Sequence, residues 1–124
     1  MTPSSYAKTL QTIYETQNIA AFAQLLSDTI FWGDPAYPAD PNACHDTTSV
    51  VARYQSMLSR GVTARVIDVL EGEETVALGL AVVWPPGIRE DPPQNRYQIF
   101  HFRKGRIDRI TGATDRASAE AAML

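Results

Sequence analysis

The stretch YQIFHFRKGRIDRI, residues 97–110, mostly alternates apolar and polar side chains on both sides of a Lys104-Gly105 step. Alternation with a period of two is typical of a β-strand, and glycine favours the backbone conformation that a tight hairpin turn requires. We therefore expect a strand at 96–103, a turn at 104–105 and a second strand at 106–114.

Two further strands precede this hairpin. Residues 62–70 and 75–84 are rich in valine and leucine, and the short EGEE segment at 71–74 has the polar composition of a turn. The PPGIREDPPQ segment at 85–94 is polar and stiffened by proline, so it is predicted to be a loop. The four strands form an antiparallel meander.

The N-terminal half has helical spacing instead. A first helix follows Ser4 and Ser5, and Asn18 is a second cap, so we expect a helical pair or one bent helix that ends near Ser27. A third helix begins between Asp46 and Thr48 and ends at Gly61, where a left-handed residue belongs. The apolar faces of these helices consist of Tyr6, Leu10, Ile13, Tyr14, Phe22, Leu25, Leu26, Val50, Val51, Tyr54, Met57 and Leu58.

Between the helices, residues 29–32 favour a brief strand, and the tail from Asp115 favours a short or frayed helix. Helices grouped before an antiparallel sheet indicate an α+β fold. We expect a single domain over residues 1–124, in which a curved, cone-shaped antiparallel sheet packs on three N-terminal helices around an internal apolar pocket.

Composition excludes several classes of function. The 124 residues carry a net charge of −3 and no run of Lys or Arg, which is unfavourable for binding nucleic acid or an anionic membrane. No apolar stretch reaches the roughly 20 residues of a membrane span, and the N-terminus does not resemble a signal peptide. The single cysteine, Cys44, excludes an internal disulfide and fits a reducing cytoplasm. We expect neither a metal nor a cofactor.

The segment IFWGDPAYPADPNACHD, residues 30–46, places one carboxylate, Asp34, among aromatic residues and prolines. Phe31, Trp32 and Tyr37 can withdraw Asp34 from water, and desolvation raises the pKa of a carboxyl group toward the range useful for proton transfer. The alternative is that Asp34 only begins a turn, as Asp before Pro often does.

The chain resembles the nuclear transport factor 2-like superfamily, in its SnoaL-like and ketosteroid-isomerase-like branch. The resemblance is carried by LLSDTIFWGDP, by a helix that opens near HDTTSVVARY and by YQIFHFRKGRIDRI, in that order over nearly the whole chain. It implies a cone of curved sheet and three helices, commonly dimeric through the outer sheet face. Members include isomerases, cyclases, dehydratases, epoxide hydrolases and proteins without catalytic activity, so the fold does not decide the function.

The resemblance also implies roles for individual residues. Asp34, directly before Pro35, falls on the general base of the isomerase-like members. The tyrosine of their first helix falls on Leu10, but Tyr14 lies one turn further on the same face. Their protonated acid falls on Gln98, whose amide can donate a hydrogen bond. The catalytic candidates are therefore Asp34, Tyr14 and Gln98, and the residues expected to contact a ligand are Phe31, Trp32, Tyr37, Tyr54, Trp84, Phe100 and Phe102.

Strand parity places other residues away from this pocket. If Gln98, Phe100 and Phe102 face the interior, then His101 faces outward, toward water or a second subunit. Three sequence neighbours do not form a triad without a special turn, so Cys44 and His45 are not expected to be catalytic, and Asp46, Thr47 or Thr48 caps the third helix. Asp115 is expected to start the terminal helix.

Three functional hypotheses remain open. The first is cofactor-free acid–base chemistry on a small hydrophobic metabolite, with Asp34 as the base. The second is a binding module with the same pocket and no turnover. The third is an interaction domain in which Tyr14, Phe100 and Trp84 fill the interior. A homodimer through the outer sheet face is expected in each case.

Overall fold

The computed structural model describes residues 3–34, 36–37, 39–41, 43–85 and 94–124. Pro35, Pro38 and most of the loop expected at 85–94 lie outside these residues. The elements are, in chain order, α1 (Pro3–Thr16), α2 (Ile19–Leu25), β1 (Leu26–Trp32), α3 (Thr47–Ser59), β2 (Thr63–Glu71), β3 (Thr75–Val83), β4 (Gln94–Arg103), β5 (Arg106–Ala113) and α4 (Arg116–Ala122).

The described strands form one open five-stranded sheet in the order β1-β5-β4-β3-β2. The strands from β2 to β5 are the antiparallel meander that the sequence predicts, and β1 adds a parallel edge beside β5. The sheet is therefore mixed, not purely antiparallel. Register shifts interrupt β1, β2 and the β4–β5 pair, and such bulges increase the twist and bend of a sheet.

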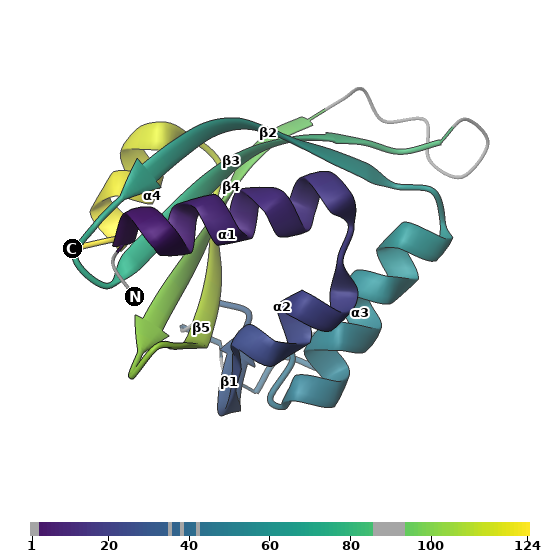
Figure 1. The fold of residues 1–124 in the computed structure, drawn as a ribbon, viewed down its shortest axis with the longest axis horizontal. Helices are drawn as coiled ribbons and strands as arrows, with labels where there is room; N and C mark the ends of the chain where they lie inside the picture. The colour runs from purple at the N-terminus through teal and green to yellow at the C-terminus, as the bar shows by residue number, and fades with distance from the viewer. Residues whose placement is uncertain (1–2, 35, 38, 42, 86–93) are drawn as a thin grey trace.

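Three helices lie against the concave side of the sheet. Figure 1 shows β2, β3 and β4 arching over α1, while α2 and α3 lie beside β1 at the other end of the molecule. The main core fills the space between them, and Leu10, Phe22, Val50, Leu78 and Phe100 are fully buried there. The α+β cone is thus confirmed.

The tail forms a fourth helix that packs on the outer side of the sheet. Ala119 of α4 is buried against Leu70, Ala77 and Ile99, in a cluster separate from the main core. Arg116 also forms an ion pair with Asp68 at 3.0 Å. The expected homodimer through this face stays a prediction, and part of the face is covered by α4.

Two turns have the backbone that the sequence indicates. Lys104 and Gly105 both have positive φ, at 52° and 80°, which is the hairpin conformation that matches strand twist. Gly61, with φ of 80°, follows the C-cap of α3.

One expected boundary is wrong. Leu26, expected at the end of a helix, is extended and begins β1, three residues before the predicted strand. Leu26 is buried in the strand, and an apolar residue would also be expected on the buried face of a helix, so its apolar character does not distinguish the two. Within the described residues, no helix is long and apolar enough to span a membrane.

Candidate functional site

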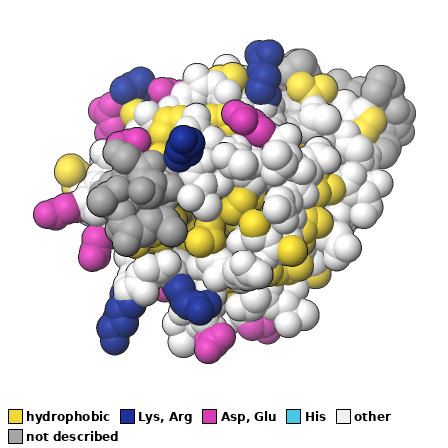
Figure 2. Space-filling view, in the orientation of Figure 1, with side chains coloured by type: hydrophobic (Ala, Val, Ile, Leu, Met, Phe, Trp, Pro, Cys, Tyr) yellow, Lys and Arg dark blue, Asp and Glu magenta, His cyan; other side chains and the backbone are white. Residues whose placement is uncertain are grey.

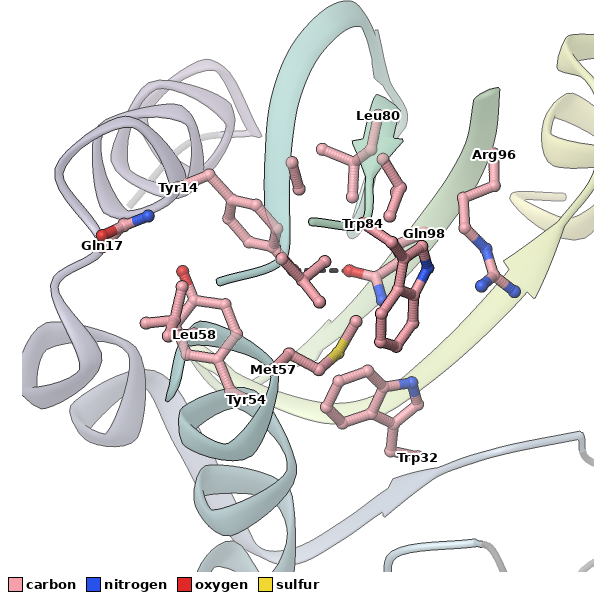
Figure 3. Close-up of a pocket in the computed structure, with 13 residues that line it drawn as sticks. Tyr14, Gln17, Trp32, Tyr54, Met57, Leu58, Leu80, Trp84, Arg96 and Gln98 are labelled. Carbon is pink, nitrogen blue, oxygen red and sulfur yellow. Dashed lines mark hydrogen bonds between the residues drawn. The ribbon is translucent and has the colours of Figure 1, made fainter. Parts of the chain in front are cut away.

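An internal cavity of about 150 Å³ lies between the helices and the concave side of the sheet. Its wall combines α1, α3, the end of β1 and the inward faces of β2, β3 and β4 (Figure 3). The lining residues are Tyr14, Gln17, Trp32, Tyr54, Met57, Leu58, Val62, Ala64, Leu80, Val82, Trp84, Arg96 and Gln98. Figure 2 shows that hydrophobic side chains gather between α1 and the α2–α3 pair on the face drawn there.

Tyr14 and Gln98 meet in the wall of this inner cavity. The Tyr14 hydroxyl donates a hydrogen bond to Gln98 Oε1 at 2.5 Å. The amide nitrogen of Gln98 makes no hydrogen bond to any described residue and points toward the cavity in Figure 3. The cavity therefore offers a ligand two N–H donors at this point.

Burial keeps Tyr14 protonated. Its side chain packs at an angle against Tyr54, with ring centroids 5.7 Å apart, and edge-on against Phe100 at 6.2 Å. Desolvation raises the pKa of the Tyr14 hydroxyl far above its usual value, and neighbouring Tyr54 raises it further. Tyr14 is thus a hydrogen-bond donor at neutral pH, and not a base.

Three aromatic side chains expected at a ligand do line the cavity, namely Trp32, Tyr54 and Trp84. Trp32 stands at the end of β1, where its backbone pairs with Cys44 through two hydrogen bonds of 2.9 Å. Tyr54 lies on the buried side of α3, and burial raises the pKa of its hydroxyl.

A second hollow adjoins the first. It has a volume of about 620 Å³ and shares Trp32, Met57, Arg96 and Gln98 with the inner cavity. We call it the outer hollow; its remaining lining residues are Gly33, Asp34, Arg53, Asn95, Thr111, Gly112, Ala113 and Thr114.

Asp34 belongs to the outer hollow and not to the inner cavity. Its side chain is exposed, and Oδ1 accepts a hydrogen bond of 2.9 Å from the backbone N–H of Ala36. The expected withdrawal of this carboxylate from water is therefore wrong. Tyr37, one of the residues expected to shield it, is itself 68% exposed.

Three other aromatic residues expected at a ligand lie elsewhere. Phe100 and Phe102 are on the inward face of β4, as parity predicts, but both are buried in the core and neither lines the cavity. Tyr6 of α1 stacks on Phe102 with centroids 3.9 Å apart and closes that end of the cone. Phe31 faces away from the cavity and packs near His45, 5.3 Å between centroids.

Several residues of the site were not predicted from the sequence. Arg96 shares the inward face of β4 with Gln98 by the same parity, so alternation alone would have found it. Arg53 is one residue before Tyr54 on α3, and its guanidinium carbon lies 5.1 Å from the centroid of the Trp32 ring. No local pattern marks Arg53, because that contact depends on how α3 packs beside β1.

The residues that the sequence predicts to lie away from the pocket do not line the inner cavity. His101 faces outward and contacts Thr111 and Arg109, and burial lowers its pKa. Cys44 is buried, while Asp46 caps α3 and Asp115 caps α4, each by accepting a 2.7 Å backbone hydrogen bond. Among the described residues, no three His, Cys, Asp or Glu side chains are grouped so as to hold a metal ion.

Known structures share this architecture. A nuclear transport factor 2-like protein of unknown function from Cytophaga hutchinsonii aligns with a TM-score of 0.68 and 13% identity, over 95% of this chain and 94% of that one. A Kribbella flavida protein provisionally named a ketosteroid isomerase aligns with a TM-score of 0.70 and 12% identity, over 90% and 76% of the two chains. A Pseudomonas putida protein provisionally named a polyketide cyclase aligns at 0.67 and 14%, over 100% and 98%.

No family model and no curated protein matches the sequence. The identities to the solved structures are low, so the comparison bears on the fold.

Proposed function

We propose that this chain, whose fold is that of the nuclear transport factor 2-like proteins, binds one small, mostly apolar molecule that carries a hydrogen-bond acceptor. The observation that carries the proposal is the Tyr14–Gln98 pair in the wall of a cavity whose lining residues are mostly hydrophobic or aromatic. Concave apolar sites with a few convergent polar groups are the usual form of small-molecule pockets.

The size of the cavity limits the ligand. A protein cavity of about 150 Å³ holds a molecule of the size of benzene. One six-membered ring with a carbonyl or hydroxyl group would fill the space, with its oxygen accepting from the Gln98 amide. Larger ligands would extend into the outer hollow past Trp32 and Met57, which line both spaces.

Binding is supported more directly than turnover. The inner cavity is lined by no carboxylate and no histidine among the described residues, and Tyr14 is held in its protonated form. Proton abstraction inside this cavity therefore has no base within its own wall.

The experiment uses the two tryptophans, both of which line the cavity. Acetophenone, a ring with one carbonyl, is titrated into ¹⁵N-labelled protein, and the two indole N–H signals are followed. We expect both signals to shift and saturate. Ala64→Leu places extra methyl groups in the cavity and should weaken binding at least tenfold, since the added volume displaces ligand.

The matched control is Ala52→Leu, the same change on the exposed side of α3. It should leave the titration unchanged. Equal binding by the Ala64→Leu protein, or no saturable shift in the native protein, would count against a ligand in this cavity.

Acid–base catalysis is the second candidate, supported by one observation: the outer hollow that contains Asp34 shares Gln98 with the inner cavity. A bound ketone would lose a proton from the carbon beside its carbonyl to the Asp34 carboxylate. The enolate oxygen would then accept hydrogen bonds from Gln98.

Deuterium exchange tests this step. Acetophenone methyl protons should exchange with D₂O faster in the presence of the protein, and Asp34→Asn should remove the acceleration while indole shifts report that the cavity is still occupied. If acetophenone occupies the cavity but its methyl protons exchange at the uncatalysed rate, the protein binds the ketone without catalysing proton transfer.

A further inference from the structure

Two arginines line the outer hollow. Arg53, half-buried on α3, and Arg96, exposed on β4, come from elements far apart in the sequence and converge on one space. Neither forms an ion pair with any described carboxylate. Arginine forks match the geometry of a carboxylate, so an unpaired pair of them is suited to an anionic group.

Trp32 holds Arg53 in place. The guanidinium carbon of Arg53 lies 5.1 Å from the centroid of the Trp32 ring, within the range of a cation–π contact. Because Trp32 also lines the inner cavity, the same indole touches the apolar part of a ligand and orients the arginine beside it. No hydrogen bond joins the Arg53 guanidinium to another described residue, so its N–H groups can donate to a ligand in the outer hollow.

The charge of the outer hollow is positive on balance. Asp34 is the one acidic residue among the described residues that line it, against two arginines. Asp34 Oδ1 accepts from Ala36, and no salt bridge joins Asp34 to either arginine. One positive charge is left without a counter-charge in the wall.

Arg96 and Gln98 are correctly spaced to hold two ends of one molecule. They lie two residues apart on the inward face of β4, which separates their Cα atoms by about 7 Å. A single ring with polar groups at opposite ends spans a comparable distance.

From these observations we infer that the natural ligand is an aromatic or alicyclic carboxylic acid, with its ring in the inner cavity and its carboxylate held by Arg96 and Arg53. The inference rests on the proposed binding function and adds the chemical class of the ligand.

The test compares two probes of the same shape. Phenylacetate carries the carboxylate, and phenylacetamide replaces it with a neutral amide. Followed by the indole N–H signals of Trp32 and Trp84, phenylacetate should bind about tenfold more tightly, since charge-assisted hydrogen bonds to guanidinium groups exceed neutral ones. Because Arg96 is exposed, 0.5 M NaCl should reduce the ratio by screening.

Substitutions test whether the two arginines cause the preference for phenylacetate over phenylacetamide. Arg96→Gln combined with Arg53→Gln should bring the ratio of the two affinities close to one. The control is Arg103→Gln, an exposed arginine on the same strand, outside both hollows, which should leave the ratio unchanged.

The outcomes separate the two proposals. Binding of both probes with equal affinity, or a carboxylate preference that survives the double substitution, overturns the inference but leaves the binding function standing. Failure of both probes and of acetophenone to bind contradicts the binding function itself.

Discussion

The hydroxyl of Tyr14 and the side-chain carbonyl of Gln98 are 2.5 Å apart, although 84 residues separate them in the sequence. This hydrogen bond joins α1 to β4 across the wall of the inner cavity. It also fixes the Gln98 amide with its nitrogen toward the cavity, because the oxygen is engaged by Tyr14.

Tyr14→Phe should therefore affect both stability and binding. The free energy of unfolding is expected to fall by about 0.5–1.5 kcal/mol, the usual net contribution of one hydrogen bond. Affinity for acetophenone should fall several-fold, since Gln98 no longer has a partner that orients its amide. Urea unfolding and the indole titration measure the two effects.

Tyr54→Phe is the stability control for that experiment. The Tyr54 hydroxyl makes no hydrogen bond to any described residue, so its removal should change the free energy of unfolding by less than about 0.5 kcal/mol. Equal losses in the two variants would mean that the Tyr14–Gln98 bond does not stabilise the fold.

Gly79 makes room for a contact on the outer sheet face. A Cβ at position 79 would lie 2.8 Å from Asp68 Cβ and 2.9 Å from Tyr97 Cε2, both too close for unshifted atoms. Tyr97 donates a 2.7 Å hydrogen bond to Asp68 at this place. Gly79→Ala should lower the free energy of unfolding by about 1–3 kcal/mol, as overpacking does.

Gly112→Ala on β5 is the matched control. Its nearest contact would be 3.8 Å, an ordinary van der Waals distance, and alanine reduces the entropy of the unfolded chain. Thermal unfolding should show a lower Tm for Gly79→Ala and an equal or higher one for Gly112→Ala. The reverse order would contradict the packing argument.

Thr75 has a buried hydroxyl that lacks a partner within the described structure. Burying an unpaired hydroxyl is unfavourable, and valine has nearly the same shape. Thr75→Val is expected to raise the free energy of unfolding by about 1 kcal/mol, measured by urea denaturation.

Thr111→Val provides the contrast. Thr111 is equally buried, but its hydroxyl contacts His101 Nε2 at 3.4 Å. Because the Thr111–His101 hydrogen bond is long and therefore weak, its loss should lower the unfolding free energy by only about 0.5 kcal/mol. Stabilisation in both variants would show that the His101 contact contributes nothing.

Acid should destabilise the protein partly through Asp46. Hydrogen bonds from the backbone and hydroxyl of Ser49 lower the pKa of the Asp46 carboxyl in the folded state. The stabilisation is complete above the unfolded-state pKa of about 3.9 and is lost as the pH falls through the lower folded-state value. Asparagine retains a capping oxygen but does not titrate there.

We therefore expect the unfolding free energy of Asp46→Asn to fall less steeply between about pH 5 and pH 2 than that of the native protein. Asp28→Asn, an exposed carboxylate that accepts no hydrogen bond from the described residues, is the control. If the unfolding free energy of the Asp46→Asn protein fell with pH as steeply as that of the native protein, the Asp46 cap would not contribute to acid destabilisation.

Local chemistry accounts for the part of the fold that was predicted from the sequence. Glycine after lysine at 104–105 specifies the hairpin, and alternation along β4 puts Gln98 and His101 on opposite faces of the sheet. The structure shows that the Gln98 face is the inward one. The meeting of Tyr14 with Gln98 follows from an apolar helix face packed on an inward strand face.

The site residues that were placed wrongly from the sequence depend on how helices and strands pack against one another. Parity shows that Phe102 faces inward, but only the position of α1 decides that Tyr6 covers it and excludes it from the cavity. Likewise, the aromatic residues around Asp34 do not enclose it, because Phe31 turns toward His45. The pairing of Arg53 with Trp32 depends on the same three-dimensional arrangement of α3 and β1.

The register shift in β2 lies in an edge strand of the sheet. β2 ends the described sheet, and an uninterrupted border strand presents backbone groups to which a strand of another molecule can add. The shift between Val66 and Asp68 breaks this row, and the charged side chains of Arg65 and Asp68 stand on either side of the partly exposed Ile67. A bulge and flanking charges on an edge strand are features that disfavour the addition of a strand from another molecule.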